Sequence, residues 1–171
     1  GVFTNTVQSL RELSIHPCLG CDSCKDSPEA DCVQNDGMQK LYPLVRDAST
    51  LLLASPVYSF HLSAQMKIFI DRLYALWNED GTDPLEGKKI ILVLSYGDDD
   101  IFASGGVNAA RSIQDLARFY RMEAPSLFHC SVGAEGAAES NSSLMERAYR
   151  FGLEWGGGRT GLQERLPAGI L

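Results

Sequence analysis

Apolar and polar positions along this chain follow two different periods, which predict strands that alternate with helices. Thr50–Ser55 and Lys89–Ser95 are nearly continuous apolar runs, as expected for strands that are covered on both faces of a sheet. Ser126–Val132 has the composition of a further strand, and Thr6–Leu10 that of a weaker one. We therefore expect four strands in the chain.

Apolar residues at helical spacing predict four helices. The pattern is clearest over Ser63–Trp77, where one face is apolar and Ser63 can cap the first turn. A second helix, Met38–Asp47, has Asp36 as its expected cap and contains Pro43, which must lie near the first turn or kink the helix. The two remaining predicted helices are Val107–Arg121 and Ser143–Trp155.

Strands that alternate with helices indicate an α/β fold with a parallel sheet. The length of 171 residues fits one domain. We place it at residues 1–158, with a cysteine-containing insert at 16–33 and a tail at 159–171. Ligands of such sheets bind at the carboxyl ends of the strands. Two loops fall there, Pro56–His61 and Tyr96–Asp100.

Composition and charge restrict the partners of the protein. The hydrophobic fraction of 44% and the charged fraction of 22% are those of an ordinary globular protein. A net charge of −7 argues against binding to nucleic acid, and no apolar run is long enough for a membrane span. The chain begins with Gly1 rather than methionine, so a targeting peptide is not ruled out. Clustered thiols favour a reducing compartment, and we expect a cytoplasmic location.

The most informative chemical feature is a run of four cysteines with the spacing C-x2-C-x2-C-x7-C, formed by Cys18, Cys21, Cys24 and Cys32. Two intervening residues let neighbouring thiolates turn toward one centre, and iron–sulfur clusters are bound by runs of this kind. The spacing favours a cluster over the alternatives, which are empty or redox-active thiols, a zinc site and disulfides. Cys130 lies in an apolar segment and is expected to be a core residue.

The two loops at the carboxyl edge have a less specific chemistry. Pro56–His61 offers backbone N–H groups and two aromatic rings that can bind a flat heteroaromatic ring, but it can equally be a turn that covers the next helix. Gly97 allows close approach of a ligand or serves the turn alone. The acidic run Asp98–Asp100 is more often a solvated tip than a magnesium site.

The segment A-S-P-V-Y-S-F-H-L-S-A-Q-M-K-I-F-I-D-R, from Ala54 to Arg72, resembles the signature of the NADPH-dependent FMN reductase family. Together with the cysteine run, it resembles the iron–sulfur flavoprotein branch of that family, whose fold is flavodoxin-like with a doubly wound parallel sheet. The resemblance extends from about Thr6 to Trp155 and is specific only in these two segments.

The resemblance implies two cofactors, FMN and a 4Fe–4S cluster, with the four cysteines of the run as cluster ligands. It implies a homo-oligomer, a dimer or tetramer, that passes electrons from a redox partner protein or NAD(P)H to a small-molecule acceptor. The residues that it assigns to the flavin are Ser55, Pro56, Val57, Tyr58, Ser59 and Phe60, with Tyr96, Gly97 and Asp98 on the other side.

One departure from the family concerns the start of the fold. Family members open with a strand, a phosphate-binding loop and a helix, and nothing before Cys18 matches that unit. We therefore expect this sequence to lack the first strand, phosphate loop and first helix, roughly thirty residues. Without them, Thr6–Leu10 has no neighbour in the usual strand order.

The leading functional hypothesis is a flavin-dependent oxidoreductase that transfers electrons through FMN and a 4Fe–4S cluster. The cofactors carry the chemistry, so no side chain is assigned as catalytic. A first alternative is an NAD(P)H-dependent FMN or quinone reductase without a cluster. A second, from a non-enzyme class, is a zinc-stabilised binding module.

Overall fold

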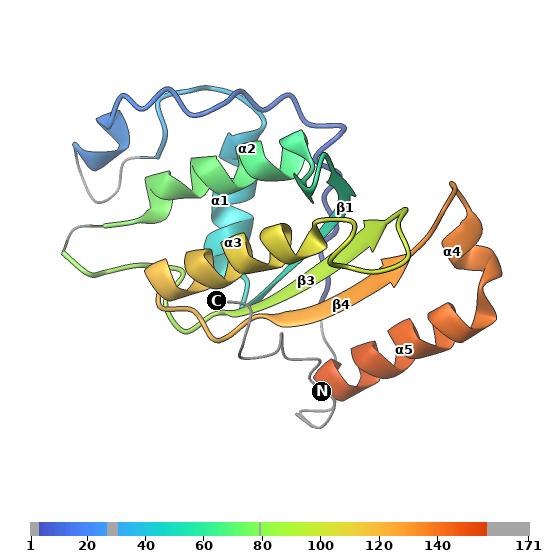
Figure 1. Ribbon diagram of the computed structural model, residues 1–171. Coiled ribbons are helices and arrows are strands. Elements are labelled where there is room, and N and C mark those ends of the chain that lie inside the picture. The colour runs from blue at the N-terminus through green and yellow to red at the C-terminus, as the bar shows by residue number, and fades with distance from the viewer. Residues whose placement is uncertain (1–3, 27–30, 79, 157–171) are drawn as a thin grey trace.

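The computed structural model of the chain describes residues 4–26, 31–78 and 80–156 (Figure 1). The predicted tail, residues 159–171, lies outside them. The strands of the described part are β1 (Thr50–Tyr58), β2 (His61–Leu62), β3 (Lys89–Tyr96) and β4 (Ser126–Ser131). The helices are η1 (Ser23–Lys25), α1 (Met38–Asp47), α2 (Ala64–Arg72), η2 (Leu73–Leu76), α3 (Gly106–Phe119), α4 (Ala137–Ser140) and α5 (Ser142–Gly156), of which η1 and η2 are 3-10 helices.

The strands form one sheet in the order β2-β1-β3-β4. The three longer strands are parallel: Thr50 pairs with Lys89 on β3, and Ile91 on β3 pairs with Ser126 on β4. β2 is a short antiparallel addition that turns back on the end of β1, where Tyr58 pairs with His61. The carboxyl ends of β1, β3 and β4 therefore meet at one edge, as the α/β prediction required.

Helices cover both faces of this sheet (Figure 1). The main core lies on the face covered by α1, α2 and α3, and contains Tyr42, Phe69, Leu92 and Ile113. On the opposite face α5 packs against β4, where the rings of Phe128 and Phe151 lie 5.4 Å apart. Within the described ranges, no helix has the length and apolar character that a membrane crossing requires.

The expectation that β1 is covered on both faces is wrong. Leu52 is 60% exposed and Ala54 is also exposed, while their neighbours Leu51 and Leu53 are buried. α5 packs on β4, and β3 separates β4 from β1, so this helix does not cover Leu52. β3 fits the expectation better, because it lies between two parallel strands and most of its residues are buried. A run of apolar residues in the sequence does not reveal whether one face of a strand is covered or both.

The weak strand predicted over Thr6–Leu10 is also wrong. The structure gives this segment no strand pairing, and Val7 is 88% exposed. A strand needs partners for its backbone N–H and C=O groups and a buried face. Thr6–Leu10 has no such pairing, and although Leu10 is half-buried against the core, Val7 remains on the surface.

The helix predictions hold, with local differences. Ser63 caps α2 as expected, and its Oγ accepts a hydrogen bond from the Met66 N–H at 3.4 Å. The N-cap of α1 is Gly37 rather than the expected Asp36, although Asp36 Oδ1 accepts a hydrogen bond from the Met38 N–H at 2.9 Å. Pro43 lies inside α1 rather than in its first turn. The predicted helix Ser63–Trp77 ends as α helix at Arg72 and continues as η2.

Candidate functional site

The aromatic loop after β1 is a two-residue hairpin turn. Ser59 and Phe60 connect β1 to β2, and both have left-handed backbone angles, with φ of 47° and 66°. Positive φ at both central residues defines the mirror-image turn that best fits the twist of a hairpin, but it is strained for residues other than glycine and asparagine. Strain of this kind concentrates at functional sites. The turn leaves Tyr58 62% exposed and Phe60 64% exposed.

The start of α3 packs against this hairpin. Gly105 has a φ of 75°, and a Cβ added there would lie 2.5 Å from the Phe60 Cβ and 2.8 Å from the Phe60 Cα. The side-chain amide of Asn108 donates to the Phe60 carbonyl at 3.2 Å. Neither residue was among those predicted from the sequence. The adjacent pair Gly105-Gly106 before a helix was the only local signal of a close contact.

Ser55 lies at the base of the hairpin and is buried. Its hydroxyl donates to the Pro56 carbonyl at 2.8 Å and accepts the Ser63 N–H at 3.0 Å. Ser55 therefore joins the end of β1 to the start of α2. Pro56 and Val57 are half-buried within β1, and Ser59 is exposed at the turn.

The loop after β3 lies beside the hairpin, because Pro56 on β1 pairs with Ser95 on β3. The ring of Tyr96 is buried and stacks on His129, with the hydroxyl 2.7 Å from His129 Nδ1. Gly97 is exposed, and a Cβ there would meet nothing within 4 Å. Asp98, also exposed, accepts a hydrogen bond on its carbonyl from Ser131 Oγ at 2.6 Å. The structure thus brings both predicted loops to one edge, but it places the ring of Tyr96 in the protein interior.

The four clustered cysteines lie on two arms, which are residues 16–26 and 31–36. All four are free thiols; Cys18 and Cys21 are exposed, whereas Cys24 and Cys32 are half-buried. Burial raises the pKa of Cys24, the charge of Lys25 lowers it, and Cys32 and Cys18 raise it further. Three of the thiols are therefore close enough to interact electrostatically.

The donor set of these arms suits a cluster, because four thiols are soft ligands and the chain supplies them within fifteen positions of one another. Hydrogen bonds from Ser23 lower the pKa of Cys21, which favours the ligating thiolate. In the described part of the chain, no three or more His, Cys, Asp or Glu side chains are grouped so as to hold a metal ion. The ligand assignment of the four cysteines stays a prediction.

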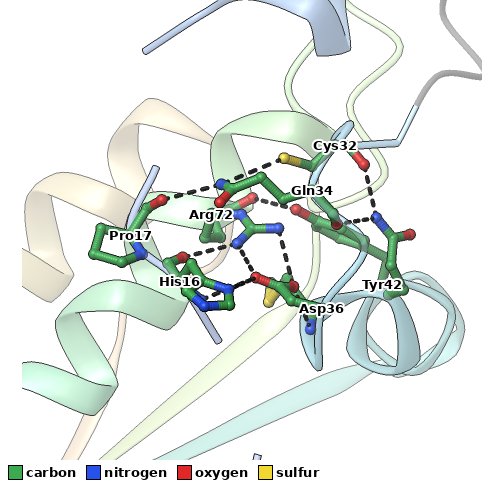
Figure 2. Close-up of polar contacts among 9 residues, drawn as sticks. His16, Pro17, Cys32, Gln34, Asp36, Tyr42 and Arg72 are labelled. Carbon is green, nitrogen blue, oxygen red and sulfur yellow. Dashed lines mark hydrogen bonds and ion pairs between the residues drawn. The ribbon is translucent and has the colours of Figure 1, made fainter. Parts of the chain in front are cut away.

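Both cysteine arms end at a buried ion pair (Figure 2). Arg72, at the end of α2, donates from Nη1 to the His16 carbonyl at 2.8 Å and to Asp36 Oδ2 at 2.7 Å, and from Nη2 to Asp36 Oδ1 at 3.2 Å. Asp36 also accepts the His16 N–H at 2.9 Å. Burial raises the pKa of Asp36, but the hydrogen bonds from Arg72, His16 and Met38 and the Arg72 charge outweigh it and lower the pKa to about 2.

Two glutamines connect the cysteine arms to each other and to α1. Gln34 Nε2 donates to the Pro17 carbonyl at 3.0 Å, which links the second arm to the first. Gln39 Nε2 donates to the carbonyls of Cys32 at 2.7 Å and Gln34 at 2.9 Å. Sequence reasoning missed Arg72 and both glutamines, because their partners lie on other segments.

Lys25 fastens the first arm to the end of η2. Its ammonium donates to the Tyr74 carbonyl at 2.6 Å and to the Trp77 carbonyl, and it lies 4.2 Å from the centre of the Tyr74 ring. A cation at the carboxyl end of a helix is favourable. These contacts also anchor Lys25, and with it the neighbouring Cys24, to the end of η2.

Comparison with known proteins identifies the relatives of this chain. The sequence profile described as NADPH-dependent FMN reductase matches residues 1–138. Two proteins of Archaeoglobus fulgidus, each named iron-sulfur flavoprotein, are 46% identical over 83 residues and 37% identical over 118 residues. These alignments cover 48% and 69% of this chain but 37% and 56% of the relatives, so the chain spans about half of their length or less.

A solved structure, general stress protein 14 of Treponema denticola in complex with FMN, is similar in fold. The similarity has a TM-score of 0.50 at 22% sequence identity, and it covers 71% of this chain and 72% of that one. The fold is therefore the flavodoxin-like α/β fold that the sequence predicted, with a mostly parallel four-stranded sheet flanked by helices.

Proposed function

The chain belongs to the NADPH-dependent FMN reductase family, and we propose that it is an electron-transfer oxidoreductase that uses FMN and a 4Fe–4S cluster. Electrons would pass from a ferredoxin-like protein or NAD(P)H to a small-molecule acceptor. The chemistry that these groups supply when bound is two-electron uptake at the flavin and one-electron transfer at the cluster.

The observation that carries the flavin part is the hairpin of Ser59 and Phe60. Its left-handed turn, backed by Gly105, holds two exposed aromatic residues at the carboxyl edge of the sheet. This is the edge at which ligands of parallel sheets bind, and a rigid loop binds with a smaller entropic penalty than a mobile one. We assign the face of the flavin ring to Pro56–Phe60.

The residues around this hairpin have different parts in the proposed site. Gly97 and Asp98 are exposed beside the hairpin and would line the other side of the ring. Ser55 and Tyr96 are buried, so their part is to hold the two loops in position, Ser55 through Ser63 and Tyr96 through His129.

The cluster part rests on the cysteine spacing and on the names of the relatives. Cys18, Cys21, Cys24 and Cys32 would hold the 4Fe–4S group, and the Archaeoglobus relatives aligned with this chain are named iron-sulfur flavoproteins. A run of thiols that binds a cluster must stay reduced, which supports the cytoplasmic location that we propose. The proposed homo-oligomer is testable by light scattering.

The test is an ultraviolet–visible spectrum of the anaerobically purified protein, before and after dithionite, with iron, sulfide and FMN assayed per chain. We expect one FMN and about four iron atoms, with broad visible absorption that dithionite bleaches. A colourless protein without iron or flavin contradicts the proposal.

A second candidate is a flavin reductase without a cluster. The observation in its favour is that the thiols are not grouped for a metal ion in the described part of the chain. The same assays separate the two candidates, because FMN without iron selects the second. Stoichiometric zinc without FMN would instead indicate a zinc-stabilised binding module.

A further inference from the structure

The arm that carries Cys18 and the arm that carries Cys32 meet at one side chain of α2. Figure 2 shows Arg72 between His16, two residues before Cys18, and Asp36, four residues after Cys32. Arg72 is 1% exposed, and the side chains of the Arg72–Asp36 ion pair are almost completely buried. A buried ion pair is expensive to form unless its geometry is good, so its presence here calls for a reason.

We propose that Arg72 is a positioning residue for the cluster: its guanidinium holds the two cysteine arms together and keeps a buried positive charge within electrostatic reach of Cys32. The inference rests on the proposed function for the identity of the bound group. It assigns no chemical step to Arg72, which acts through the arms and through its charge.

The role of Arg72 in holding the two arms together follows from the shape of its guanidinium group, which has several donors in one plane. Nη1 bonds both to the first arm, at the His16 carbonyl, and to the second arm, at Asp36, while Nη2 makes the second bond to Asp36. A planar group with several donors can make these bonds together, whereas a lysine ammonium is a single point charge. Arg72 therefore fixes the spacing of the two arms in a way that lysine cannot reproduce.

The proposed effect of the Arg72 charge on the cluster follows from the groups that surround the guanidinium. Burial lowers the pKa of Arg72, but Asp36, Tyr42 and the charge of Cys32 raise it, so Arg72 and Cys32 lie within electrostatic reach of each other. The Arg72 Nε–H is buried and has no hydrogen-bond partner among the described residues. Nearby charge and hydrogen bonds set the potential of a cluster.

The position of Arg72 also relates the two proposed cofactor sites. α2 begins next to Ser63, which bonds to Ser55 at the base of the hairpin, and it ends at Arg72. Nine helical residues span about 14 Å. One short, rigid helix therefore separates the flavin hairpin from the residue that holds the cysteine arms.

The experiment compares Arg72→Lys, Arg72→Gln and Asp36→Asn in the full chain, purified anaerobically, with Arg111→Gln as the control. Arg111 forms a surface ion pair with Asp115 on α3, away from the cysteine arms. The measurements are the FMN and iron content, the rate of iron loss to a chelator, and the midpoint potential of the cluster.

The decisive outcome is a shift of the cluster midpoint potential in opposite directions in Arg72→Gln and Asp36→Asn. Arg72→Gln removes a positive charge and should lower the potential, whereas Asp36→Asn removes a negative charge and should raise it. Arg72→Lys keeps the charge, so the potential should stay close to wild type, while iron loss becomes about 10–100-fold faster in all three variants. FMN content should not change. A structural defect alone would not give shifts of opposite sign.

The outcomes separate the inference from the proposed function. A wild-type protein with a cluster, combined with unchanged potentials and iron loss in the variants, overturns the inference alone. A wild-type protein without iron overturns the proposed cluster, and the role of Arg72 in holding the two arms together is then judged by amide hydrogen exchange at His16 and Met38, which donate to Asp36. Exchange there should be about tenfold faster in Arg72→Gln than in Arg111→Gln; equal rates overturn it.

Discussion

Gly105 lies so close to Phe60 that a Cβ at position 105 would come within 2.5 Å of the Phe60 Cβ. The contact joins the first turn of α3 to the hairpin between β1 and β2, two segments that are far apart in the sequence. It also explains how two non-glycine residues remain in a left-handed turn: the backbone of Phe60 is held between Gly105 and the amide of Asn108.

Replacing Gly105 with alanine should therefore disturb the hairpin. The φ of 75° and the clash with Phe60 together should lower the free energy of unfolding by about 1–3 kcal/mol. FMN affinity should fall as well. Urea unfolding and a flavin titration measure the two effects. Gly133→Ala is the matched control, because a Cβ there meets nothing within 4 Å and should change stability by less than about 0.5 kcal/mol. Equal effects at both positions contradict the expectation.

Phe60→Asn tests the aromatic ring separately from the turn. Asparagine tolerates left-handed angles, so the hairpin should persist with little loss of stability. The loss of the ring should weaken FMN binding about threefold to tenfold, as expected for one aromatic contact. Val7→Asn serves as the control, since Val7 is exposed on a segment without strand pairing. An unchanged flavin dissociation constant in Phe60→Asn argues that Phe60 does not touch the ring.

The buried carboxylate of Asp36 should make stability depend on pH. Its pKa is about 2 in the folded protein against an ordinary value of 3.8, so the folded state favours the ionised form. This contribution, about 2 kcal/mol, is fully present above pH 4 and is lost as the pH falls through 4 toward 2. Urea unfolding between pH 6 and pH 2.5 should show a shallower pH dependence in Asp36→Asn than in wild type. Parallel curves would falsify the assignment.

Lys25→Met should loosen the first cysteine arm. The variant loses the bonds from the ammonium to the carbonyls of Tyr74 and Trp77, and its free energy of unfolding should fall by about 1 kcal/mol. Lys67→Met is the comparison, because Lys67 forms an exposed ion pair with Asp71 one helical turn away and should cost less than about 0.5 kcal/mol. A larger loss in Lys67→Met than in Lys25→Met would refute the role given to Lys25.

The sequence predicted what local signals determine. The apolar stripe of α2 and the cap at Ser63 follow from residues a few positions apart, and the structure has both. It also predicted that the loops after β1 and β3 share an edge, because parallel strands align their carboxyl ends.

What the sequence did not reveal depends on contacts between distant segments. Ser59 and Phe60 are not residues that indicate a mirror-image turn, and the support from Gly105 comes from another helix. Asp36 was expected only as a helix cap, because its partner Arg72 lies on α2 and a charged residue rarely indicates complete burial. The cysteine spacing pointed to a shared ligand but not to how the two arms are held.

The open face of β1 affects how the protein should be handled in solution. Leu52 and Ala54 are exposed there, and from Thr50 to Pro56 the strand has β3 as its single neighbour among the described residues. An unpaired strand edge with exposed apolar side chains can pair with strands of other copies, which promotes aggregation in concentrated samples. Replacing Leu52 with lysine places a charge on this face without touching the main core, and it should raise the concentration at which the protein begins to aggregate.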